Sequence, residues 1–166
     1  MNAQITPAEL KTVREGLGLT IGDLAVLAGV SERTARYWES GQQGRTTTPP
    51  DVAQMVWEID RQVTAAAIET RTMFLAQTNE TGKQPSQVVL LRYRENAHLW
   101  QFQPEMRPLP VATHGAMLTR CRLALQEIGV DARIIYMEPQ PYFRWLGELV
   151  DTPATRAHWA SLQLEG

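Results

Sequence analysis

The segment that most constrains the fold is residues 20–41, TIGDLAVLAGVSERTARYWESG, because it marks where two short helices begin and end. Thr20, with Asp23 three residues later, has the pattern of a capping box. Gly29 suits the left-handed turn that ends a helix, and Ser31 caps the next one. The sequence therefore predicts two helices joined by a tight turn. Helices this short are stable only when they pack against other elements.

The second of these helices has two different faces. Ala35 and Trp38 lie three residues apart and are predicted to face the core. The residues off that stripe are Glu32, Arg33, Arg36, Tyr37 and Ser40. A tight pair of helices of this kind is the helix-turn-helix pattern, whose second helix lies in the major groove of DNA. We therefore expect the exposed face of this helix to meet base edges.

A capped helix precedes this pair. Thr6, Pro7 and Glu9 supply a capping hydroxyl, a first-turn proline and a carboxylate three residues after the cap, so a helix is predicted over 7–15.

A polar loop and a long helix follow the pair. Thr48 is predicted as the cap and Pro49 as the residue at the first helical position, and the long helix itself is predicted over about 50–78. Its apolar residues recur every three or four positions, at Val52, Met55, Val56, Ile59, Val63, Ala66 and Ala67.

The pattern changes in the second half of the chain, where two segments are apolar and β-branched enough for strands, 87–94 and 132–137. Helices are predicted to be capped by Asn96, to open at Thr113 or His114, and to begin at Thr152 with Pro153. The fold class is therefore mainly α, with a helical helix-turn-helix domain and a small C-terminal α+β domain of about two strands. The predicted domains are 1–80, which includes the long helix, and 81–166.

The charge composition limits the ways in which this chain could bind nucleic acid. The 166 residues carry a formal net charge of −2. In the first fifty residues, five cations (Lys11, Arg14, Arg33, Arg36, Arg45) balance five anions (Glu9, Glu15, Asp23, Glu32, Glu39). Binding to nucleic acid must then come from charge placed on one face, since the summed charge gives no long-range attraction.

Other classes of function find little support. A lone cysteine, Cys121, cannot form an intramolecular disulfide, and it lacks metal-ligand spacing with His98, His114 and His158. The segment MNAQITPAEL lacks the layout of a signal peptide, and no apolar run is long enough to cross a bilayer. We expect a cytoplasmic protein with no catalytic activity, no metal, no cofactor and no membrane association.

The segment TIGDLAVLAGVSERTARYWES resembles the opening of MerR-type regulators, which continue into a similar RT-x-RYYE run. Residues 19–41 are also similar to the consensus of lambda-repressor-like, or XRE-type, helix-turn-helix domains. Those domains have a helix ahead of the pair and further helices behind it, as is predicted here. They commonly carry a phosphate-contacting Gln early in the first helix of the pair, where this chain has Ile21 and Gly22.

A narrower resemblance covers about residues 10–137. The runs YWESG, LLRYRENAHLW and LTRCRLALQEIGVDARIIYM resemble the YdiL-like family of regulators and the related anti-CRISPR-associated autorepressors. This resemblance implies a domain that binds inverted repeats in double-stranded DNA and a small α+β domain that pairs two chains. It implies Arg33 and Arg36 at bases, Tyr37 at a phosphate or base edge, and Arg45 at the DNA backbone. The full predicted interface is Ser31, Glu32, Arg33, Thr34, Arg36, Tyr37 and Arg45.

These observations predict a homodimeric DNA-binding transcriptional regulator, a repressor that recognises an inverted repeat through residues 31–40 and acts by covering a promoter, with its own promoter as one candidate. Two alternatives remain open. In one, the C-terminal domain binds a protein partner, as an antitoxin does, and DNA binding is autoregulatory. In the other, the chain is a ligand-sensing regulator or a degenerate enzyme, whose small molecule would lie among Trp100, Tyr136, Phe143 and Trp145.

Overall fold

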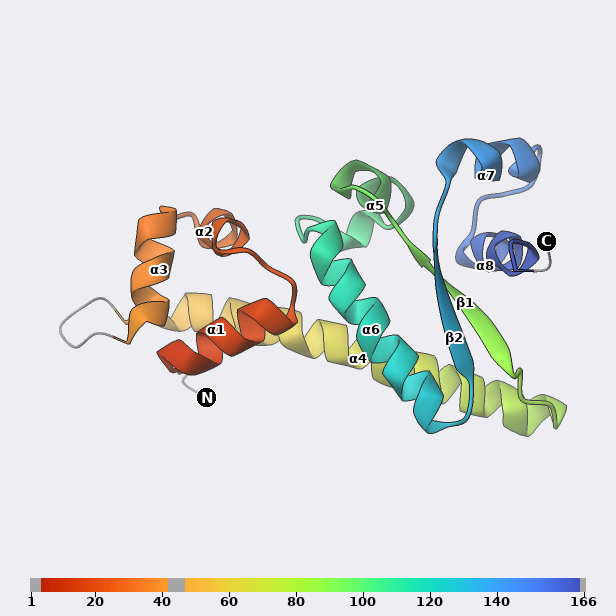
Figure 1. Cartoon of the computed structure of the whole chain (residues 1–166), viewed down its shortest axis with the longest axis horizontal. Helices are drawn as coiled ribbons and strands as arrows, with labels where there is room; N and C mark the ends of the chain where they lie inside the picture. Colours follow the sequence, from red (N-terminus) through yellow and green to blue (C-terminus); the bar gives the residue numbers. More distant parts are fainter. Residues whose placement is uncertain (1–3, 42–46, 165–166) are drawn as a thin grey trace.

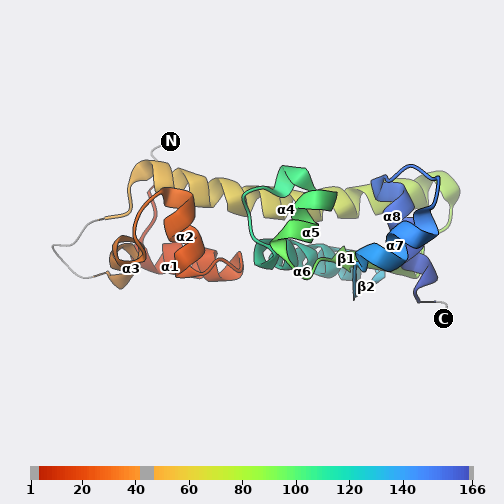
Figure 2. The same cartoon turned by 90° about the horizontal axis from the view of Figure 1, so that it is seen from above.

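The computed structural model describes residues 4–41 and 47–164. Over these residues the chain is mainly helical, with a small parallel sheet of two strands. The molecule is elongated, and one long helix, α4 (Pro50–Thr81), runs along most of its length (Figures 1 and 2). Three short helices gather around its first half, and the sheet with the remaining helices lies along its second half.

The three short helices are α1 (Pro7–Gly16), α2 (Ile21–Ala28) and α3 (Glu32–Ser40), and their predicted caps are confirmed. Capping boxes form at Thr6 and at Thr20, and Gly29 adopts the left-handed conformation with φ of 65°. Together with the start of α4 they enclose a small core of Leu10, Leu24, Ala25, Ala35, Trp38, Val52 and Val56.

The long helix begins at residue 50, as its predicted bounds have it, but the predicted roles of Thr48 and Pro49 were wrong. Pro49 occupies the cap position in an extended conformation, with ψ of 147°, and no side chain caps the helix, so Thr48 does not have the predicted role. The physical reason is the following residue. The ring of Pro50 disfavours the helical conformation for the residue before it, so α4 cannot begin at Pro49.

The two halves of the molecule are in contact rather than joined only by a linker. A second apolar cluster joins the chain just after α1, the helix α4 and the chain before α6 (Val111–Glu127). It consists of Leu17, Leu19, Ile59, Val63 and Leu109. A Cβ built on Gly18 would lie 2.8 Å from the carbonyl oxygen of Ala112, so the two backbones meet at this point. The helix α4 also packs along α6, so it belongs to both halves.

The sheet consists of β1 (Gln87–Arg92) and β2 (Asp131–Tyr136), which pair in parallel from Gln87 opposite Asp131 to Arg92 opposite Tyr136. Parallel neighbours need a crossover connection. Here it comprises α5 (Asn96–Phe102), the 3-10 helix η1 (Pro104–Met106) and α6. Two strands were predicted, and the structure shows that they pair with each other.

Two predicted helix starts in this half were wrong. Helix α6 begins at Val111, so Thr113 and His114 lie inside its first turn, where both are buried. Asn96 is the first residue of α5 and not its cap. Its side-chain oxygen instead accepts a hydrogen bond from the backbone N–H of Val111 at 2.7 Å, so it satisfies the start of a different helix.

The chain ends in α7 (Pro139–Leu146) and α8 (Pro153–Leu162), the second of which begins at the predicted Thr152 cap. They cover one face of the sheet through a buried cluster of Tyr93, Leu99, Phe102, Met137, Tyr142, Leu146, Trp159 and Ala160. Across the residues that the structure describes, no helix combines the length and the apolar character needed to span a membrane.

Candidate nucleic-acid interface

The orientation of α3 is fixed by its cap and its buried face. The Ser31 hydroxyl accepts a hydrogen bond from the backbone N–H of Thr34 at 3.2 Å. Ala35 is fully buried and Trp38 is 2% exposed, as their spacing predicted. Because these contacts hold one side of the helix against α1 and α2, the opposite side faces solvent.

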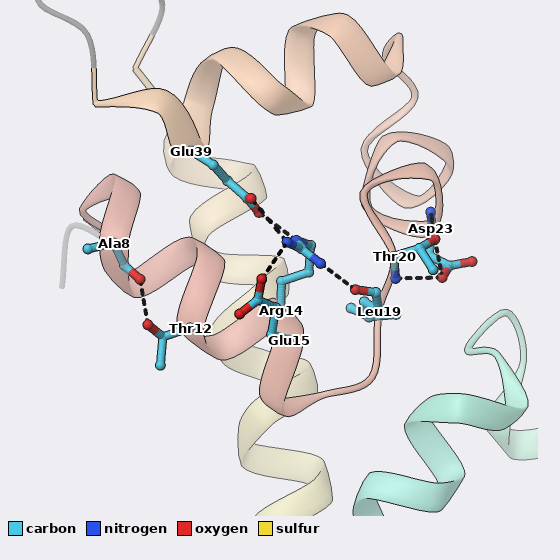
Figure 3. Close-up of polar contacts among 8 residues, drawn as sticks. All are labelled: Ala8, Thr12, Arg14, Glu15, Leu19, Thr20, Asp23 and Glu39. Atoms are coloured by element: carbon cyan, nitrogen blue, oxygen red, sulfur yellow. Dashed lines mark hydrogen bonds and ion pairs between the residues drawn. The ribbon is translucent and has the colours of Figure 1, made fainter.

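A buried ion pair adds a second constraint on α3. Arg14 of α1 donates from Nε and Nη2 to the two carboxylate oxygens of Glu39, at 2.5 and 3.1 Å, and from Nη1 to the backbone oxygen of Leu19 at 2.7 Å (Figure 3). The hydrogen bonds that Arg14 donates to Glu39 raise the pKa of Arg14 above its already high ordinary value, so the guanidinium stays charged. The pair therefore ties the first helix to the last turn of α3.

Sequence reasoning missed this ion pair, although a signal was present. Arg14 follows Leu10 by four residues and precedes Leu17 by three, so it falls on the apolar stripe of α1. A charged residue on a buried stripe needs a partner of opposite charge. The position of that partner in α3 depends on how the helices pack.

The exposed face of α3 carries Arg33, Arg36 and Glu32, all with exposed side chains. Arg33 donates from Nε to the hydroxyl of Tyr37 at 2.6 Å. Arg36 and Glu32 form an ion pair at 2.8 Å, with side chains 65% and 55% exposed. An exposed pair one helical turn apart contributes only about 0.3–0.5 kcal/mol, so each arginine can leave its partner for a stronger one.

Charge on this face is more positive than the sequence count indicates. Glu39 points inward to Arg14, so its charge is neutralised within the protein. Among the described residues of α3, the outward side is left with two arginines and one glutamate. The equal numbers of cations and anions in the first fifty residues therefore conceal a local excess of positive charge.

Glu32 lies beside the start of α2. A Cβ built on Gly22 would lie 3.1 Å from its Oε1, so the carboxylate occupies the space that a longer side chain at position 22 would need. The corner between the starts of α2 and α3 therefore holds a negative charge.

The structure brings together six of the seven predicted interface residues. Ser31, Glu32, Arg33 and Arg36 are exposed, whereas Thr34 and Tyr37 are half-buried. Ser31 serves as the helix cap. The seventh predicted residue, Arg45, lies outside the described residues.

The four aromatic residues considered as a small-molecule site, Trp100, Tyr136, Phe143 and Trp145, do not all lie together. Phe143 stacks on Phe102 with ring centroids 5.6 Å apart, and Trp145 packs against the buried cluster. The indole of Trp100 donates to the backbone oxygen of Leu109 at 2.9 Å. Tyr136 lies apart from these, beneath the guanidinium of Arg94 at 3.9 Å. Three of the four therefore contribute to packing between elements.

The described residues also contain no cluster of potential metal ligands. Within residues 4–41 and 47–164, no group of three or more His, Cys, Asp or Glu side chains is placed to hold an ion. His114 is buried in α6, where burial and, to a smaller extent, the charge of Arg92 lower its pKa to about 4.

The sequence matches no model of a known protein family. A search among curated proteins also finds no match.

Proposed function

We propose that the protein is a sequence-specific, double-stranded DNA-binding transcriptional regulator of the helix-turn-helix type, and that α3 is its recognition helix. The observation that carries the proposal is the asymmetry of α3. Its inner side is held by Trp38 and by the ion pair of Glu39 with Arg14, and its outer side presents Arg33 and Arg36.

Arginine suits this role because its planar guanidinium forms two parallel hydrogen bonds to O6 and N7 of guanine. Each such contact discriminates against the wrong base by about 1–3 kcal/mol. A recognition helix also needs a backbone that does not move when the side chains bind. The caps at Ser31 and Gly41 and the buried Arg14 supply that rigidity.

The position of α3 in the molecule is compatible with groove binding. The helix lies near one end of the elongated molecule, away from the sheet and from α7 and α8 (Figure 1). DNA could therefore approach α3 without contact with the second half of the chain. As an active form we propose a dimer that recognises an inverted repeat and represses by covering a promoter.

The test is binding of the purified chain to DNA from upstream of its own gene, measured by fluorescence anisotropy at two salt concentrations. We expect tight binding that weakens with salt, as contacts to phosphates require. The double variant Arg33→Ala, Arg36→Ala should lose specific binding. Arg61→Ala is the matched control, because Arg61 is also exposed and paired one turn away on its own helix, but lies on α4.

Whether Arg33 contacts bases is tested by comparing the effect of Arg33→Ala on binding to specific DNA with its effect on binding to nonspecific DNA. Arg33→Ala should weaken binding to the specific site by about 1–3 kcal/mol, and binding to unrelated DNA much less. Equal losses on both DNAs would exclude base reading by Arg33. Absence of binding by the unmodified chain at low salt would contradict the proposed function itself.

A further inference from the structure

A cavity of about 430 Å³ lies where the two halves of the molecule meet. One wall is the end of α1 and the turn after it, with Glu15 and Gly18. The opposite wall combines β1, which contributes Arg92, with α6, which contributes Gly115 and Thr119. Figure 1 shows the end of α1 directed toward α6. The volume falls within the range of small-molecule sites, about 300–1,000 Å³.

The side chain of Arg92 occupies space that a glycine leaves on α6. A Cβ built on Gly115 would lie 2.6 Å from Cζ of Arg92, so a larger residue at position 115 would displace the guanidinium. Arg92 is half-buried, and its side chain forms no ion pair or hydrogen bond within the described residues. The charge of Arg92 contributes to the lowered pKa of His114, but this histidine supplies no negative charge in return. A partly desolvated cation without a partner is unfavourable, and a bound anion would relieve that cost.

The α1 side of the cavity has the opposite charge. The side chain of Glu15 is 56% exposed and contacts Arg14 at 3.4 Å (Figure 3). Arg14 already donates two shorter hydrogen bonds to Glu39, so the carboxylate of Glu15 can accept a second cation. The last carbonyl groups of a helix add partial negative charge at the same place. Glu15 and Arg92 do not pair with each other, so the cavity has an anion on one wall and a cation on the other.

We propose that this cavity binds a free amino acid with an apolar side chain, so that its carboxylate pairs with Arg92 and its ammonium group pairs with Glu15. A guanidinium binds a carboxylate through two parallel hydrogen bonds. A simple anion such as phosphate would be repelled by Glu15, and a simple cation would be repelled by Arg92. A small zwitterion satisfies both charges at once.

The rest of the lining favours an apolar side chain on the ligand. The remaining side chains that the argument needs are small or apolar and belong to Ala112, Ala116, Leu118 and Ile134. The hydroxyl of Thr119 already donates to the backbone oxygen of Gly115 at 3.1 Å. A charged side chain on the ligand would therefore lose hydration without gaining a partner. We expect alanine, valine or leucine to bind in preference to aspartate or lysine.

A ligand in this cavity would contact both α1 and α6. Glu15 directly follows Arg14, whose ion pair with Glu39 ties α1 to α3. Occupancy of the cavity would therefore act on the helix that positions α3. If the amino acid changes the affinity for DNA, then DNA changes the affinity for the amino acid by the same factor. This consequence rests on the proposed function, whereas binding of the amino acid does not.

The first test is thermal unfolding of the full chain with each common amino acid in turn at millimolar concentration. We expect alanine, valine or leucine to raise the midpoint temperature, because a ligand that binds only the folded chain stabilises it. Calorimetric titration then gives the dissociation constant of the best of them. Its N-acetyl derivative and its methyl ester each lack one of the two charges, and each should bind at least about tenfold more weakly. No stabilisation by an apolar amino acid, or equal binding of the blocked derivatives, would overturn the proposal.

A second test locates the binding site. Arg92→Gln should weaken binding of the same amino acid at least about tenfold, because the ligand carboxylate loses its guanidinium. The matched control is Arg133→Gln, since Arg133 is exposed on the neighbouring strand and is not part of the cavity lining. Equal affinities of these two variants would contradict binding in this cavity.

The opposite wall provides a variant that does not disturb a half-buried residue. Glu15→Gln changes an exposed side chain and should also weaken binding, because the ligand ammonium group loses its carboxylate. Circular dichroism establishes that each variant is folded. Unchanged affinity in Glu15→Gln would overturn the proposed orientation of the ligand. An unmodified chain that binds the amino acid but no DNA would leave this inference intact and contradict the proposed function.

Discussion

Arg14 and Glu39 lie 25 residues apart in the chain and form a two-point ion pair, with side chains that are both only 11% exposed. A buried pair of this kind stabilises little relative to an apolar pair, but removal of one partner leaves an uncompensated charge. The pair therefore matters less for overall stability than for the position of α3 relative to α1.

Glu39→Gln should lower the free energy of unfolding by about 3 kcal/mol, the lower end of the range for breaking a buried pair. The matched control is Glu15→Gln, since Glu15 contacts the same guanidinium at 3.4 Å with a side chain that is 56% exposed. It should change stability by less than about 1 kcal/mol. Urea unfolding measures both. Similar losses in the two variants would mean that burial does not govern this interaction.

Glu32→Gln should strengthen binding to DNA. The carboxylate lies at the start of α2 and pairs with Arg36, so it opposes an incoming phosphate and competes for that arginine. Its neutralisation should improve affinity by about fivefold at low salt, or about 1 kcal/mol, and less at high salt. Anisotropy titrations measure this change. Weaker binding to every DNA sequence would instead indicate that Glu32 accepts a hydrogen bond from a base.

Substitution of two glycines tests the contact between the halves of the molecule. Gly18 and Gly29 have nearly the same positive φ, 68° and 65°, so alanine is strained by a similar amount at each. Only at Gly18 would the new Cβ meet backbone, the carbonyl oxygen of Ala112. Gly29→Ala should lower the free energy of unfolding by about 1 kcal/mol, which is the strain of the left-handed conformation alone. Gly18→Ala should lower the free energy of unfolding by more than this, because the Cβ clash adds to the strain. Thermal unfolding of the two variants measures the difference in their stability.

His114 should make the protein less stable in mild acid. Burial lowers its pKa to about 4 in the folded chain, from an ordinary value of 6.5, so the unfolded chain binds more protons between these values. Stability is then complete above about pH 6.5 and falls as the pH approaches 4, by about 3 kcal/mol in total.

The measurement for this prediction is urea unfolding from pH 4 to pH 7. His114→Gln should remove most of this slope even if it lowers stability at pH 7. His158→Gln, at an exposed histidine, is the control. A slope that persists in His114→Gln would assign the acid sensitivity to other groups.

The local signals in the sequence determined the first half of this protein well. Thr6, Thr20 and Ser31 cap the helices that they were predicted to cap, and Ala35 and Trp38 are buried. Capping bonds join residues three positions apart and glycine acts on its own φ, so these features depend on the nearest neighbours alone.

Features that depend on contacts between distant residues required the tertiary structure. Asn96 looked like a cap for its own helix, but its side chain meets Val111 because the chain folds back there. The inward direction of Glu39, and hence the surplus of positive charge on α3, is set by Arg14 on another helix. The open edge of β2 likewise exists because β1 is its only partner strand among the described residues. The sequence by itself determined where α1, α2 and α3 begin and end, and packing decided which charges and backbone groups are left to meet a partner.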